Sequence, residues 1–283
     1  MPPRKAPTAR QRRLGAELRK IREQAGISLT EAAAQLSTDR TAMSNIESGR
    51  FGVSSERVRT WASHYDCPDQ AYVDALAAMA EERGRGWWDD YRDDLSAGQL
   101  DLSELEHHAV ALRTVQIMHM PGLLQTEDYA RAVFEEAVPP LRPIDLRRRL
   151  SHRMRRRDVL DRPDAPACTF LIHEAALRMT YGGRGIALQQ LDYLLKQSER
   201  DNLTVRVIPF RVGGFPYAGS STLYAHGPVP QLDTVQTDTA TGPAFLDAET
   251  RLANYRAVLD RTEEKSYDPV RSRDFIREMA QQV

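Results

Sequence analysis

Four polar and basic side chains within residues 40–45 have the chemistry to recognise DNA bases. They are Arg40, Thr41, Ser44 and Asn45. On a helix, this spacing brings all four to one broad face. An arginine can donate two hydrogen bonds to O6 and N7 of guanine, and an asparagine can pair with adenine in a similar way. The pattern therefore predicts a helix that lies in the major groove of DNA and reads its sequence.

Two short helices must position these side chains, over residues 29–36 and 39–47. An apolar stripe runs along both helices and consists of Leu29, Ala32, Ala33, Leu36, Met43 and Ile46. Ser28, with Glu31 three residues later, predicts a capping box at the first helix, and Asp39 is the expected N-cap of the second. This order of helix, tight turn and helix is typical of a helix-turn-helix unit.

Three further helices complete a predicted five-helix domain over residues 1–83. They are expected at residues 9–25, 55–64 and 70–83, and Gly26 should end the first of them.

The charge of the chain is unevenly distributed. Residues 1–60 contain twelve Lys and Arg against six Asp and Glu, whereas the rest of the chain has a formal charge of −7. A basic first part favours a nucleic-acid-binding module. Residues 1–9 are expected to form a basic arm, which either follows the phosphate backbone or minor groove or is a solvated tail.

The segments LTEAAAQL and DRTAMSNIESGR, followed by a helix with Trp61, resemble the Xre family of phage-repressor-like helix-turn-helix regulators. The resemblance covers roughly residues 10–75, and MSNIESGR is its most specific part. It implies base contacts from Arg40, Thr41, Ser44 and Asn45, phosphate contacts from Ser28 and Arg50, and a structural pair between Arg22 and Glu47. Thr38 departs from the family, which usually has an apolar residue in this turn. Because one short helix reads only a half-site of double-stranded DNA, we expect a homodimer.

Composition limits the class of protein. Charged residues make up 28% of the chain and hydrophobic residues 41%, which is typical of globular domains. The sequence has no apolar run of about 18 residues and no apolar core of a secretory signal near its start. Cys67 and Cys168 lack the spacing of a metal site and are expected to be reduced. We therefore expect a cytoplasmic protein without a metal or a cofactor and with no membrane contact.

Residues 84–283 are expected to form a second, α+β domain after a hinge at Gly84-Arg85-Gly86. The expected strands cover residues 168–173, 204–210, 221–226 and 233–239 and form a small antiparallel sheet. The expected helices cover residues 104–118, 126–134, 145–160, 186–200, 246–259 and 270–279. The fold is then mainly α, with an α+β second domain.

The helix over residues 145–160 is rich in arginine and allows two interpretations. Its arginines are Arg147, Arg148, Arg149, Arg153, Arg155, Arg156 and Arg157. One interpretation is a second nucleic-acid surface. The other, which we favour, is a solvated helix that pairs with the domain's own carboxylates or docks an acidic protein.

The second domain also resembles a known family. The segments WWDDY, PGLLQTEDYA, FLIHEAALRMTYGG and GGFPYAGSSTLY follow the order found in the C-terminal domain of unknown function of actinobacterial WhiJ-like Xre regulators. The resemblance covers roughly residues 85–280, and PGLLQTEDYA is its most specific part. It implies a domain that senses a ligand or docks a small partner protein of the BldB type, and it provides no catalytic residues. Residues 233–239 depart from the family's more apolar, glutamate-ended strand.

No catalytic motif is complete in the sequence. His173-Glu174 begins like the HExxH zinc motif but lacks its second histidine. Residues 182–185 match neither phosphate-binding glycine motif, and Ser220-Ser221 lacks the GxSxG context of a nucleophile elbow. We therefore expect that the protein is not an enzyme.

Three hypotheses follow for the whole chain. The first is a DNA-binding regulator whose second domain binds a small acidic partner protein. The second is the same regulator with a small-molecule effector in place of that partner. The third is a nucleotide-handling enzyme fused to a DNA-binding domain. The candidate ligand or partner surface comprises Trp87, Trp88, Arg149, Arg153, Arg156, Glu174, Arg178 and Tyr217. Within this set, the two tryptophans are expected to seal a joint between two surfaces.

Overall fold

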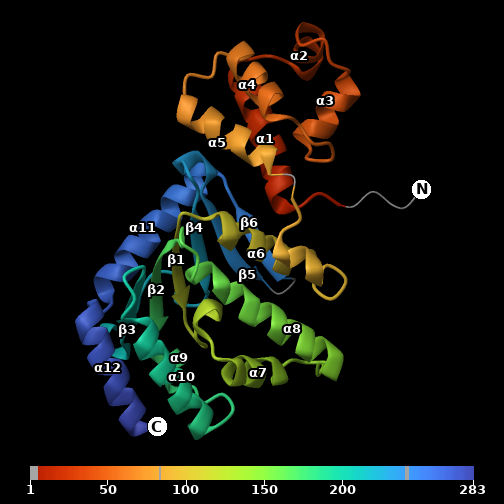
Figure 1. The fold of residues 1–283 in the computed structure, drawn as a ribbon. Helices are drawn as coiled ribbons and strands as arrows, with labels where there is room; N and C mark the ends of the chain where they lie inside the picture. The colour runs from red at the N-terminus through yellow and green to blue at the C-terminus, as the bar shows by residue number, and fades with distance from the viewer. Residues whose placement is uncertain (1–5, 83, 240–241) are drawn as a thin grey trace. The chain divides into compact units, whose positions relative to one another are not determined.

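The chain divides into two compact units, Met1–Asp89 and Asp90–Val283, in the computed structural model (Figure 1). The structure describes residues 6–82, 84–239 and 242–283. Residues 1–5 of the predicted basic arm, and Arg83 at the predicted domain boundary, lie outside the described residues. The division after Asp89 comes a few residues later than that predicted boundary.

The described residues of the first unit form five α-helices, as the sequence predicted. They are α1 (Ala9–Gln24), α2 (Leu29–Gln35), α3 (Arg40–Glu47), α4 (Ser55–His64) and α5 (Gln70–Glu81). Leu18, Met43, Trp61 and Leu76 come from four of these helices, and each is at most 2% exposed. The apolar stripes of the helices therefore meet in one core.

Glycine ends α1 and α3 in the left-handed region. Gly26 has a φ of 72° after α1, as predicted, and Gly49 has the same φ after α3. At Gly49 the chain turns so that the amide of Arg50 donates to the carbonyl of Asn45 at 2.8 Å, the long bond of a Schellman motif. A Cβ at Gly49 would lie 2.7 Å from the carbonyl oxygen of Gln11. The end of α3 therefore approaches the backbone of α1 too closely for any side chain.

The second unit combines seven α-helices with six strands in its described residues. Its helices are α6 (Ala97–His108), α7 (Glu127–Glu135), α8 (Pro143–Arg156), α9 (Glu174–Arg178), α10 (Arg184–Gln197), α11 (Glu249–Lys265) and α12 (Pro269–Gln282). Its strands are β1 (Ala111–Gln116), β2 (Ala167–His173), β3 (Leu203–Ile208), β4 (Thr222–His226), β5 (Thr234–Thr239) and β6 (Gly242–Leu246). Short 3₁₀ helices are η1 (Trp87–Tyr91), η2 (Gly122–Leu124), η3 (Arg157–Leu160), η4 (Phe210–Val212) and η5 (Pro230–Leu232). The predicted fold class is confirmed, and no described helix is long and apolar enough to cross a membrane.

The sheet is mixed, with the strand order β3-β2-β1-β4-β5-β6 (Figure 1). β1, β2 and β3 are parallel, whereas β4, β5 and β6 pair antiparallel with their neighbours. The expectation of an antiparallel sheet is therefore wrong for the two parallel ladders. Parallel neighbours need a long crossover, and α7 with α8, then α9 with α10, provide the two crossovers.

The helix predicted over residues 104–118 is wrong in its second half. α6 ends at His108, and β1 then lies at the centre of the sheet between β2 and β4. Leu112 and Val115 have helical spacing, yet they enter hydrophobic cores on opposite faces of the sheet. A central strand gains backbone hydrogen bonds on both sides, and this tertiary contribution overrides local periodicity. Residues 242–246 form the edge strand β6, which pairs with β5, and the helix predicted from residue 246 begins at Glu249.

The two faces of the sheet have separate cores. Phe170 and Ile172 of β2 enter a core completed by α7, α9, α10 and α12. Leu171, between them in sequence, enters a smaller core that includes side chains of α11. On the α11 face, Arg113 of β1 donates to Glu263 at 2.9 Å, which ties the helix to the central strand. The alternation of side chains along β2 thus fixes which helices cover each face.

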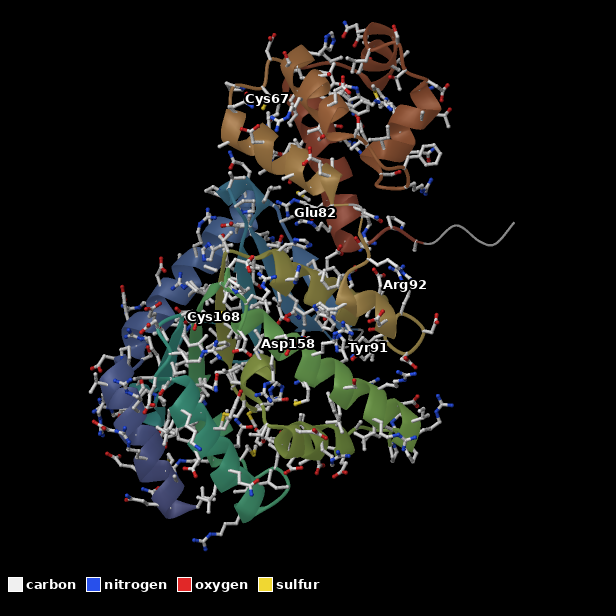
Figure 2. All side chains as sticks on the ribbon, in the orientation of Figure 1. Cys67, Glu82, Tyr91, Arg92, Asp158 and Cys168 are labelled. Atoms are coloured by element: carbon white, nitrogen blue, oxygen red, sulfur yellow. The ribbon has the colours of Figure 1, made fainter. Side chains whose placement is uncertain are left out.

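Both cysteines are free, as the sequence predicted. Cys67 follows α4 in the first unit, and Cys168 lies on β2 of the second (Figure 2). Burial, together with the nearby Glu106 carboxylate, raises the pKa of the Cys168 thiol to about 12. Cys168 therefore remains a neutral core residue at physiological pH.

We expect Gly49→Ala to destabilise the first unit by about 2–4 kcal/mol, because a left-handed φ and a backbone overlap both oppose the added Cβ. Thermal unfolding of the full chain measures the change. Gly52→Ala is the matched control, since a Cβ there meets nothing within 4 Å and the φ is not left-handed. Equal melting temperatures for the two variants would show that the contact between α1 and α3 is not tight.

Candidate nucleic-acid interface

The predicted base-reading residues lie on one surface of α3. Arg40, Thr41 and Ser44 are exposed, and Asn45 is half-buried. Within the described residues, none of these four side chains forms a hydrogen bond or ion pair. The opposite side of α3 is buried through Met43 and Ile46. The helix therefore presents a row of free donors and acceptors over a fixed apolar base.

A buried ion pair holds the C-terminal end of α3. Arg22 of α1 donates through Nε and Nη2 to the two carboxylate oxygens of Glu47, at 2.7 and 2.8 Å. The remaining terminal nitrogen of Arg22, Nη1, donates a hydrogen bond to the Ile27 carbonyl at 2.7 Å. The hydrogen bonding between Arg22 and the Glu47 carboxylate is the main cause that raises the pKa of Arg22 above its ordinary value. The pair implied by the resemblance is thus present, and it joins α1, the loop after it and α3.

Side-chain caps fix the start of each helix in the motif. The Asp39 carboxylate accepts from the amide of Ala42 at 2.8 Å, as predicted for the N-cap of α3. Ser28 and Glu31 form the predicted capping box of α2, with bonds of 3.2 and 2.9 Å. Hydrogen bonds from Ser28 also lower the pKa of the Glu31 carboxyl. Ser28 is therefore engaged as a cap, and it remains exposed at the start of α2.

The turn between α2 and α3 is held by a contact that sequence reasoning missed. Ser37 has a φ of 47°, so the chain reverses without a glycine. The Thr38 hydroxyl donates to the Leu36 carbonyl at 3.1 Å and accepts from Arg57 of α4 at 3.3 Å. Arg57 in turn lies over the Trp61 ring at 5.1 Å. A hydrogen bond from α4 thus holds this turn at the position where the resemblance led us to expect an apolar residue.

The predicted phosphate-contacting residue Arg50 follows the glycine turn after α3. It is exposed, and its side chain forms no hydrogen bond or ion pair with the residues that the structure describes. Its backbone amide is fixed by the Asn45 carbonyl. A free guanidinium on a fixed backbone fits a phosphate contact beside the base-reading face.

Most arginines of α8 are used inside the second unit. Arg156 forms a buried, bidentate pair with Glu106 of α6, at 2.6 and 2.9 Å. Arg155 donates to Asp90 at 2.8 Å, and Arg148 lies 3.4 Å from Asp94. These contacts support the interpretation in which the arginine-rich helix pairs with the domain's own carboxylates.

The candidate ligand or partner residues of the second half do not form one site. Glu174 accepts from Arg178 at 2.7 Å and from the amide of Phe210 at 2.8 Å, so its carboxylate anchors η4 to α9. Tyr217 is 53% exposed and stacks on Tyr255. Trp87 and Trp88 belong to the first unit and contact each other edge-to-face at 5.9 Å. Their predicted role in sealing a joint stays a prediction.

Arg149, Arg153 and Arg156, in contrast, line one cavity of about 460 Å³ within the second unit. His152 lies beside them, and its Nε2 is 2.9 Å from the hydroxyl of Ser103. Burial, with additional repulsion from Arg156 and Arg153, lowers the pKa of His152 to about 3. The imidazole is therefore neutral at physiological pH, and the positive charge of the cavity comes from the arginines.

Comparison with protein families gives two matches. A family described as a helix-turn-helix domain matches residues 13–76. A family described as a domain of unknown function (DUF5753) matches residues 99–278, more than half of the chain. The comparisons with curated proteins and with solved structures gave no match.

Breaking the Arg22–Glu47 pair from one side should destabilise the first unit strongly. We expect Arg22→Met to cost about 3–5 kcal/mol of unfolding free energy, because the Glu47 carboxylate stays buried without a partner. The double variant Arg22→Met/Glu47→Gln should lose less than the sum of its single variants in a denaturant-unfolding cycle. Arg19→Ala, which removes an exposed pair with Glu23, is the control and should cost at most about 1 kcal/mol. Additive single effects would mean that the pair does not act as a unit.

The His152 imidazole should remain neutral in the folded protein at pH 5, as measured by ¹⁵N chemical shifts. Its folded pKa of about 3 lies below the unfolded value of about 6.5, so the neutral form stabilises the fold above pH 6.5. That contribution is lost as the pH falls from about 6.5 to 3, by up to about 1.4 kcal/mol per pH unit. His152→Gln should flatten the loss of stability in this window. Protonation of His152 near pH 6 would contradict the proposed burial.

Proposed function

The chain belongs to the family of proteins with the DUF5753 domain and carries a helix-turn-helix domain before it, and on this basis we propose that it is a sequence-specific DNA-binding transcriptional regulator. In this proposal α3 enters the major groove of a half-site. Arg40, Thr41, Ser44 and Asn45 face the base edges, while Ser28 and Arg50 contact phosphates. The protein would act on DNA in the cytoplasm.

The observation that carries the proposal is the free polar face of α3. The side chains of Arg40, Thr41 and Ser44 have no partners among the described residues, whereas arginines such as Arg22 and Arg57 elsewhere in the first unit are engaged by protein groups. A base-reading helix needs this combination of a fixed backbone and unengaged donors, because its side chains must exchange water for base edges without losing internal bonds.

The finer features of the proposal rest on the resemblance to WhiJ-like Xre regulators of actinobacteria. The sequence MSNIESGR at the end of α3 and the Arg22–Glu47 pair support the Xre type. A homodimer is proposed because one recognition helix reads only one half-site.

The other part of the proposal is that the second unit controls the DNA-binding activity. The resemblance favours a small acidic partner protein of the BldB type. A small-molecule effector is the alternative, and the cavity lined by Arg149, Arg153 and Arg156 favours it specifically.

We propose that the chain acts by binding and not by catalysis. His173, the one histidine with a motif-like context, caps the amide of Ala175 at the start of α9 and contacts the rings of Phe210 and Phe215. Its neighbour Glu174 is held by Arg178 and a backbone amide. Both side chains therefore have structural partners, which counts against the alternative of a nucleotide-handling enzyme.

Arg40→Ala should weaken specific DNA binding by about 1–3 kcal/mol and relax the preference at one base pair. Arg50→Ala should instead weaken specific and non-specific binding alike and reduce the salt dependence by about one charge. Both are measured by fluorescence titration of the operator found by genomic footprinting, at several salt concentrations. Arg19→Ala is the control, because this exposed arginine pairs with Glu23 on α1. Wild-type affinity and base preference in Arg40→Ala would refute α3 as the recognition helix.

A further inference from the structure

Two adjoining hollows open on one face of the sheet in the second unit. The larger measures about 460 Å³ and lies among α6, α8 and the strands β5 and β6. The smaller measures about 170 Å³ and reaches inward over β1, β2 and β4. Both are lined by Leu102, Arg153, Arg156 and Asp238, so they share a wall. Together they offer space in the range typical of small-molecule sites.

Arg153 stands at this shared wall and forms no direct ion pair with a carboxylate among the described residues. Its guanidinium lies over the Phe134 ring at 4.9 Å and donates to the amide oxygen of Gln125 at 2.5 Å. Gln125 is fully buried, and its own amide nitrogen donates to the Met120 carbonyl at 2.8 Å, which turns its oxygen toward Arg153. No carboxylate pairs with Arg153 among the described residues. A guanidinium has five N–H donors, so most of those of Arg153 are left for the cavity.

The neighbouring carboxylates make their direct contacts with groups other than Arg153. Arg156 is matched by Glu106, and Asp94, which lines the larger hollow, lies 3.4 Å from Arg148. Asp238 is the remaining carboxylate on the wall, and it accepts from the Gln236 amide at 2.9 Å instead of pairing with an arginine. Arg149 adds a further positive charge to the lining, while His152 is neutral.

The electrostatics of Arg153 agree with this arrangement. Burial of its guanidinium, together with the positive charge of Arg156, lowers the pKa of Arg153 to about 9, although the carboxylates of Glu106 and Asp238 act in the opposite direction. The residue is half-buried, so part of its surface still faces the cavity. At physiological pH it stays protonated, and an anion placed against it would relieve the cost of burial.

A second, independent feature lies in the smaller hollow. The carboxamide oxygen of Gln116, at the end of β1, is buried and has no hydrogen-bond partner. Gln116 lines the same hollow as Arg153. A buried acceptor without a donor costs about 1–3 kcal/mol, so such atoms in folded proteins usually have a partner.

We propose that this cavity is a ligand site for a small organic oxyanion, which Arg153 holds through its guanidinium and which donates a hydrogen bond to Gln116. The inference deepens the small-molecule branch of the proposed function. The ligand's charged group is a phosphate or a carboxylate, because both accept two parallel bonds from a guanidinium. Its remaining part is small and carries an O–H or N–H group, since the inner hollow is about 170 Å³ and presents an unpartnered acceptor.

Titration of the full-length protein with inorganic phosphate and with acetate, each against sodium chloride at the same ionic strength, tests the site. Binding is followed by the side-chain Nε–H resonance of Arg153 and by the melting temperature of the second unit. We expect one of the two anions to shift both observables in a saturable way, and the better anion identifies the charged group of the ligand. Arg153→Lys should weaken the binding about tenfold, because it keeps the charge and loses the planar pair of donors.

Asp238→Asn provides a second variant on the shared wall. Removing this carboxylate should strengthen anion binding several-fold, because it no longer repels the ligand or competes for Arg153. Arg147→Gln is the matched control, since Arg147 is an exposed arginine of the same helix outside the cavity lining, and it should bind the anion as the wild type does.

Three outcomes would overturn the proposal. They are no saturable shift beyond that of sodium chloride, equal weakening in Arg147→Gln and Arg153→Lys, and an Asp238→Asn variant that binds no better than the wild type. Because these titrations contain no DNA, their failure would leave α3 and its operator binding untouched. Loss of operator binding in Arg40→Ala, in turn, would not alter the anion titration.

Discussion

A guanidinium group that leaves water must find acceptors, and this constraint organises both units of the chain. In the first unit Arg22 meets Glu47, with both side chains at most 7% exposed, and this pair fixes α3 against α1. In the second unit Arg156 meets Glu106 and fixes α8 against α6. Each pair uses two parallel hydrogen bonds, which set orientation as well as distance. Arg153 has the neutral amide oxygen of Gln125 as its acceptor and no carboxylate partner among the described residues, and for that reason we propose it as the ligand contact.

In the first unit, the polar side chains that hold the fold are distinct from those that have no internal hydrogen bond. Helix ends, the turn and the ion pair all use side chains internally: Asp39 caps α3, Ser28 caps α2, and Thr38 is bound by Arg57. The outer face of α3 is left without internal bonds. Such a division suits recognition, because a rigid backbone lowers the entropy lost on binding while free side chains keep their hydrogen-bonding capacity for the partner.

The second unit places a polar strand where an apolar one would close the core. Residues 233–239 depart from the more apolar strand of the family resembled, and Gln236 and Asp238 of this strand line the inner hollow. Asp233, just before it, binds the Tyr224 hydroxyl at 2.7 Å and the Gly227 amide at 3.0 Å. The departure that the sequence shows at β5 therefore has two consequences: one polar residue secures the turn, and two others line the inner hollow.

The sequence by itself determined the features that depend on neighbouring residues. It predicted the five helices of the first unit, the caps at Ser28 and Asp39 and the exposed face of α3, since capping and amphipathic spacing act within a few residues. Tertiary structure alone decided that residues 111–116 form the central strand and that the crossovers through α7 to α10 make β1, β2 and β3 parallel. It also decided that Arg153 forms no ion pair with a carboxylate, whereas Arg22 and Arg156 do. Strand pairing and ion pairing join residues far apart in the chain, so no local pattern specifies them.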